Sequence, residues 1–206
     1  MQRKLFLLSG LAFVALVLAT VIGIGGSTPG TGASGAKLAS FYDDHALRQG
    51  AGSFVLALAG LFIVLFGIGL AAASADSSWR YVLLIGTGLV SASALLTGFI
   101  HFALANGGDE RIAPAALQAL NSLDANSWVF FNAAFGVMMV GAAGAILAGA
   151  DSRWLGWTAL VLGIAIFIPF VDFFALLGTL LWIAVASVAL SRSQSEPAIV
   201  AAPGAA

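Results

Sequence analysis

Residues 154–190 read "WLGWTALVLGIAIFIPFVDFFALLGTLLWIAVASVAL", and this stretch decides what kind of fold the chain can adopt. As a single helix, these 37 residues would be roughly 55 Å long, whereas the hydrocarbon core of a bilayer is about 30 Å thick. Near the middle, Pro169 lacks a backbone N–H, and Asp172 carries a charge that is costly at the bilayer centre. The stretch therefore predicts a hairpin of two short membrane spans, about 155–169 and about 173–190, with Asp172 at the turn.

The composition of the whole chain also favours lipid as its solvent. Of the 206 residues, 61% are hydrophobic and 8% are charged, whereas an ordinary soluble domain is about 25% charged. A water-soluble domain of this size could not bury so much apolar surface, because its surface is too large relative to its volume. We therefore expect an all-α bundle of six transmembrane helices in a single domain. The four earlier apolar runs predict spans at about 5–26, 50–73, 81–104 and 127–149.

The first of these spans follows "MQRK" and is longer than the hydrophobic region of a signal peptide, which is about 7–15 residues. We therefore expect it to be retained as a helix. The last segment, 191–206, is small, polar and Pro-containing, and it predicts a disordered cytoplasmic tail.

The basic residues predict the orientation of the chain in the membrane. Six spans place both termini on one side, and the side that carries more Lys and Arg is normally cytoplasmic. Of the eight basic residues, three would then lie outside, and five would lie inside: Arg3, Lys4, Arg80, Arg153 and Arg192. We expect a multi-pass protein of the bacterial cytoplasmic membrane with both termini cytoplasmic.

Two similar stretches indicate an internal repeat. "ADSSWRYVLLIGTG" begins at Ala75 and "ADSRWLGWTALVLG" begins at Ala150, and each joins one apolar span to the next. This favours a parallel duplication in which the second and third spans match the fourth and fifth. The alternative is that both turns independently need Asp or Ser caps and an interfacial Trp. Each unit is preceded by a segment that predicts a short outer helix, which lies on the membrane surface or caps the bundle.

Four polar residues near the outer helix ends form the candidate ligand-binding cluster. The segment "FYDDHALRQG", 41–50, brings His45 to the start of the second span, and His101 lies near the outer end of the third. Asn132 and Asp172 are expected at the same level. Ionisable groups inside a membrane are functional candidates, but they can also simply reach headgroups and water or tie helices together.

Metal binding is the most specific function that this cluster could support. His45 and His101 could ligate a haem iron, or a divalent metal together with Asp44. However, no spacing matches a known metal motif, and only His101 lies inside a span. We therefore predict no cofactor, and haem or a divalent metal remains the alternative.

Small residues predict close helix packing. Gly88 and Ala92 on the third span, and Gly141, Ala145 and Gly149 on the fourth, have the small-xxx-small spacing that lets two helix backbones approach. The contact would be either within the bundle or with a partner chain.

The order of these features resembles a group of actinobacterial multi-pass membrane proteins that have no established activity. The matching residues are Tyr42, Asp44 and His45, then "RWLGW" at 153–157, then Pro169, then "LLWIAVASVAL" from Leu180. The resemblance implies a six-helix architecture and no particular chemistry.

The sequence excludes several function classes. It has no basic cluster that could bind nucleic acid, no Cys, no phosphate-binding loop and no nucleophile elbow. We therefore expect a non-enzymatic accessory or scaffold subunit that contacts the bilayer and either other membrane subunits or copies of itself. The alternatives are a small transporter or lipid-binding protein, and a metal- or haem-binding redox protein.

Overall fold

The structure is a computed structural model that describes residues 2–24, 28–74, 76–107, 112–149 and 152–193. Within these ranges the chain is helical, and the all-α prediction is confirmed. The expected tail lies mostly outside the described residues. The helices are α1 (Gln2–Leu18), the π-helix η1 (Ala19–Ile24), α2 (Gly35–Ala73), α3 (Trp79–Gly107), α4 (Pro114–Ala125), α5 (Trp128–Leu147), α6 (Arg153–Ala165) and α7 (Asp172–Ser193).

Within the described residues, five helical segments are long and apolar enough to cross a membrane: α1, α2, α3, α4 with α5, and α7. The sixth apolar segment, α6, has 13 residues, or about 20 Å of helix. The predicted hairpin is present, since α6 ends at Ala165 and α7 begins at Asp172. Helix α6 ends earlier than expected because Pro169 has no N–H to donate to the Ala165 carbonyl, and its ring would clash with that carbonyl in a helix. Phe170 then reverses the chain with a φ of 67°.

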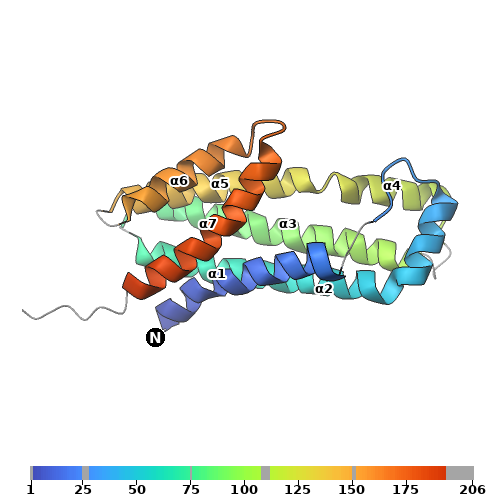
Figure 1. Cartoon of the computed structure of the whole chain (residues 1–206), viewed down its shortest axis with the longest axis horizontal. Helices are drawn as coiled ribbons and strands as arrows, with labels where there is room; N and C mark the ends of the chain where they lie inside the picture. Colours follow the sequence, from blue (N-terminus) through green and yellow to red (C-terminus); the bar gives the residue numbers. More distant parts are fainter. Residues whose placement is uncertain (1, 25–27, 75, 108–111, 150–151, 194–206) are drawn as a thin grey trace, which may run out of the picture.

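Neighbouring membrane helices pack side by side, and α7 returns to α1, so that α1, α2, α3, α5, α6 and α7 form a closed ring (Figure 1). One end of this ring holds the start of α1 and the end of α7, and we call it the terminal end. The opposite end is the far end. The five basic residues assigned to one side of the membrane all belong to the first or last turns, or to the α2–α3 connection, at the terminal end (Figure 1).

The far end is closed by a small second core, which we call the outer cap. It joins the start of α2, the end of α3 and α4 through four fully buried side chains, Leu38, Tyr42, Leu104 and Leu117. The two predicted outer segments therefore pack on the bundle. Helix α2 continues from the cap into the bundle and changes direction on the way (Figure 1). The sequence "GAGS" at 50–53 explains the bend, because Gly and Ser pairs are common sites of helix kinks.

Helices α3 and α5 approach each other closely through glycines. A Cβ added to Gly86 would meet the backbone of Val137 and Met138, and one added to Gly141 would meet the backbone of Leu83. Backbones at this separation require residues without a side chain on the facing surfaces. These two contacts also set the register between α3 and α5, that is, which residue of α5 lies level with each residue of α3.

Candidate functional site

The four predicted polar residues do not form one cluster. With Gly86 opposite Met138 and Leu83 opposite Gly141, Asn132 falls level with Ala92 on the antiparallel helix α3. His101 lies nine residues further along α3, which is about 13 Å of helix. The structure therefore divides the cluster into a site around His101 and a separate pair formed by Asn132 and Asp172.

His101 connects three helices at the base of the outer cap. Its Nε2 lies 2.6 Å from Oε1 of Gln49 on α2, and its Nδ1 lies 3.1 Å from Oδ2 of Asp124 on α4. Gln49 is fully buried, and the His101 and Asp124 side chains retain 17% and 14% of their exposure. The ring of Tyr42 meets His101 edge-on, with 6.2 Å between the centroids. This network ties α2, α3 and α4 together where the bundle ends.

The geometry suits both protonation states of the His101 ring. Asp124 offers a carboxylate acceptor, so Nδ1 carries the hydrogen. The amide of Gln49 can accept from a protonated Nε2 through its oxygen, or donate to an unprotonated Nε2 through its nitrogen. Because both ring nitrogens are engaged, a metal ion could bind His101 only by displacing Gln49 or Asp124. The arrangement fixes the relative positions of α2, α3 and α4.

A cavity of about 220 Å³, lined by both polar and apolar residues, includes His101 and Asp124 in its wall. Its lining includes five side-chain hydroxyls, from Thr20, Thr28, Ser53, Thr97 and Ser127. The hydroxyls of Thr20 and Ser53 donate to carbonyls one turn back on their own helices, at 2.9 and 3.0 Å. A cavity of this size and polarity suits a few water molecules, which need two to four polar partners each.

His45 does not join His101. Its Nδ1 lies 2.8 Å from the carbonyl oxygen of Phe41, one turn back on α2, and its ring stacks on the Phe41 ring at 4.5 Å. Asp44 is exposed. Among the described residues, no group of three His, Asp or Glu side chains could hold a metal ion. Tyr42, rather than His45, is the cap residue that faces His101.

Asn132 and Asp172 form the second polar pair. Nδ2 of Asn132 donates to Oδ2 of Asp172 at 3.2 Å, which joins the start of α5 to the first residue of α7. The side-chain oxygen of Asn132 is buried and has no hydrogen-bond partner among the described residues. An apolar cavity of about 340 Å³ adjoins the pair, between Trp128 and Pro169. This pair holds the α6–α7 hairpin against the bundle.

The small residues predicted for packing are divided between two surfaces. Gly141 and Ala145 are buried within the bundle, whereas Gly88 and Ala92 point outward from α3. Gly149 lies beyond the end of α5.

Sequence reasoning did not identify Gln49 and Asp124 as the partners of His101. A signal for Gln49 existed, because an uncharged amide at the start of an apolar span needs a partner when it is buried. No comparable signal marked Asp124, since its contact depends on how α4 folds back on α3. No protein-family model, curated protein or solved structure matches this chain.

Proposed function

We propose that this chain is a non-enzymatic accessory or scaffold subunit of a larger membrane complex, and that helix α3 carries its docking surface. The observation that supports this most directly is the outward-facing pair Gly88 and Ala92. A Cβ added to Gly88 would have no atom within 4 Å, and Ala92 is exposed one turn further along the same face. Close packing among the residues that the structure describes does not explain either small residue.

The surroundings of the pair match a helix-docking surface. Large exposed side chains flank it along α3, among them Leu84, Ile85, Leu95 and Leu96. Large apolar side chains in a membrane can simply face lipid. Small residues that recur one turn apart instead form a groove into which a second helix packs by van der Waals contact. The partner we expect is therefore a membrane helix, either from another subunit or from a second copy of this chain.

The polar residues support a structural role rather than catalysis. His101 is engaged by Gln49 and Asp124, and Asn132 is engaged by Asp172. Each contact joins different helices of the bundle. We infer that these groups hold the scaffold together.

We further propose that the terminal end faces the cytoplasm of a bacterium. The five basic residues at that end support this orientation, because cytoplasmic loops are enriched in Lys and Arg. Cysteine scanning with a membrane-impermeant thiol reagent tests it, since the chain has no native cysteine. Ser78→Cys should be protected in intact cells, and Asp43→Cys should be labelled. The reverse pattern would contradict the orientation.

Purification from native membranes in a mild detergent tests the docking role. Mass spectrometry of the intact assembly should show this chain with a stoichiometric membrane partner or a second copy. A monodisperse, partner-free chain extracted from native membranes would contradict the proposal.

The structural observations bear differently on each of the alternative functions. A transporter was expected to gather His101, Asn132 and Asp172 around one outward pocket, but those residues line two separate cavities. Haem or metal binding at His101 would require displacement of Gln49 or Asp124, and an absorption spectrum with elemental analysis tests it. Lipid binding is favoured by a different observation, an apolar groove between α6 and α7.

A further inference from the structure

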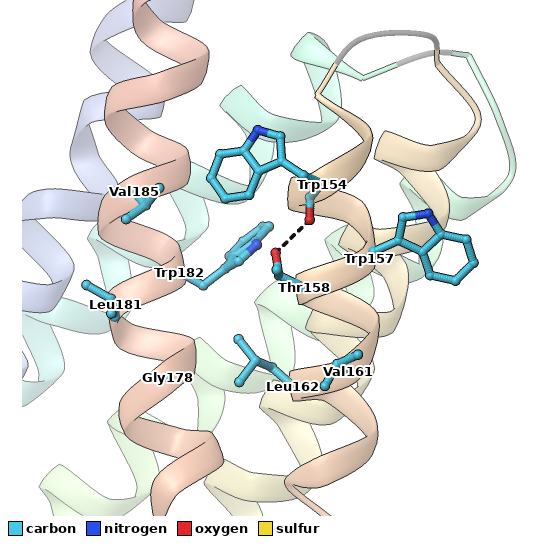
Figure 2. A pocket seen from close by; sticks show the side chains of 9 residues that line it. All are labelled: Trp154, Trp157, Thr158, Val161, Leu162, Gly178, Leu181, Trp182 and Val185. Carbon is cyan, nitrogen blue, oxygen red and sulfur yellow. Dashed lines mark hydrogen bonds between the residues drawn. The ribbon is translucent and has the colours of Figure 1, made fainter.

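Helices α6 and α7 enclose an apolar groove of about 480 Å³. The two helices meet near their turn and separate toward the terminal end (Figure 1). Figure 2 shows the rings of Trp154 from α6 and Trp182 from α7 between the two helices, whereas the ring of Trp157 points away from α7. The volume falls within the range of about 300–1,000 Å³ that is usual for small-molecule sites.

The lining offers a ligand hydrocarbon contact and almost no hydrogen bonding. The Thr158 hydroxyl donates to the carbonyl of Trp154 at 2.9 Å, and the Trp182 indole N–H donates to the carbonyl of Leu155 at 3.0 Å. The inner wall is closed because Leu162 packs against Gly178, which has no side chain. A long, narrow apolar ligand fits this lining, and a polar solute does not.

The wide end of the groove is basic. Arg153 is the first residue of α6, is exposed, and directly precedes Trp154. Arg192 is exposed in the last turn of α7 at the same end. At the same end, Oδ1 of Asp76 in the α2–α3 connection lies 2.9 Å from the Arg80 guanidinium. Asp151 lies outside the described residues. This charge favours an anionic group next to the hydrocarbon site, at the level where Trp residues meet the lipid headgroups.

We propose that the groove binds one acyl chain of an anionic phospholipid, whose phosphate is bound by Arg153. Trp154 and Trp182 cover the acyl chain, and the arginine selects the headgroup by charge. The site is separate from the docking surface on α3, so the inference goes beyond the proposed function. A helix from a second copy of this chain is the competing occupant.

The experiment uses the full chain, stripped of lipid by detergent exchange and reconstituted into nanodiscs of phosphatidylglycerol and phosphatidylcholine in equal amounts. After gentle extraction, native mass spectrometry counts the lipids retained on each chain. We expect about one phosphatidylglycerol per chain, retained about fivefold over phosphatidylcholine, since one basic residue near a membrane surface contributes about 1 kcal/mol toward anionic lipid.

Two variants, each with a matched control, separate the contributions to binding. Val161→Trp fills the groove and should abolish retention of both lipids, and Leu61→Trp, on an exposed face of α2, is its control. Arg153→Gln should keep a retained lipid but remove the preference for phosphatidylglycerol. Arg80→Gln removes a charge from the same end, outside the groove, and should preserve that preference. Thermal unfolding of each variant confirms that it is folded.

Three outcomes would overturn the proposal. Equal retention of the two lipids by the wild type would remove the anionic selectivity. Unchanged retention by a folded Val161→Trp would place the lipid elsewhere. A dimer mass that disappears in Val161→Trp would identify a second copy as the occupant and would also reject the phospholipid.

Discussion

Helix α3 presents small residues on two opposite faces, and the two faces behave differently. On the inner face, Gly86 lies against the backbone of α5, and a Cβ added to Gly98 would lie 3.0 Å from the carbonyl oxygen of Ser53 on α2. On the outer face, Gly88 meets nothing within 4 Å. The inner face carries more small residues than the outer face, where Gly88 and Ala92 stand among large apolar side chains. Among the described residues, only the inner face packs against other helices of the chain.

This difference separates two uses of the same residue type. Glycine destabilises an ordinary helix by about 1 kcal/mol relative to alanine, so its presence in a helix interior calls for a reason. On the inner face, the reason is the close approach of α2 and α5. On the outer face, the described residues offer no internal reason, and the proposed partner helix would supply one. A larger residue on the inner face should therefore destabilise the fold. A larger residue on the outer face should leave the fold stable and weaken binding of the proposed partner.

The largest expected effect comes from the inner face. Gly86→Leu would force a side chain into the backbone of Met138, which cannot yield without moving α5. We expect a loss of about 3 kcal/mol or more in the free energy of unfolding, at the upper end of the usual cost of overpacking. Thermal unfolding in detergent, followed by tryptophan fluorescence, measures it. Wild-type stability in this variant would contradict the α3–α5 packing described above.

The His101 network should give the next largest effect. His101→Leu leaves the fully buried Gln49 amide and Asp124 without this partner, and unsatisfied buried groups cost about 1–3 kcal/mol each. The double variant His101→Leu with Gln49→Leu should recover part of the loss, since it removes both polar groups.

His45→Leu is the matched control, because the described contacts of the His45 ring stay on its own helix. It should change the unfolding free energy by less than about 0.5 kcal/mol. Equal losses in His45→Leu and His101→Leu would mean that the network does not hold the outer cap.

The hairpin contact should matter less. Asp172→Leu removes the hydrogen bond from Asn132, and hydrogen bonds between membrane helices average about 0.6 kcal/mol. Asp172→Asn retains an acceptor oxygen and should stay near wild-type stability. The same unfolding assay separates them, and a loss in Asp172→Asn as large as that in Asp172→Leu would indicate that the charge, rather than the hydrogen bond, stabilises the hairpin.

The sequence was sufficient to predict the helical class, the apolar runs and the hairpin at Pro169, because these depend on hydropathy and backbone chemistry. It did not predict that α2 would continue without interruption from the outer cap into the bundle, or that α6 would end at Ala165. The spacing of small residues identified candidate packing positions, but it did not show whether each one points into the bundle or outward. That choice depends on how each helix is rotated in the ring, which distant residues determine.

The candidate site was harder to predict for the same reason. Helix lengths alone suggested that His101 and Asn132 share one level, whereas the glycine contacts between α3 and α5 separate them by about 13 Å. The partners of His101 come from α2 and α4, and both contacts depend on the folded cap.

The smallest effect on stability is expected from the outer face, and it provides the most direct test of the docking role. Gly88→Leu should be at least as stable as the wild type, because open space surrounds the new side chain and leucine favours a helix more than glycine does. Ala15→Leu, at an exposed position on α1, is the matched control. The measurement is native mass spectrometry of the three proteins extracted from their own membrane. The stoichiometric partner should remain on the wild type and on Ala15→Leu and be lost from Gly88→Leu, whereas equal retention by all three would contradict the assignment of α3 as the docking surface.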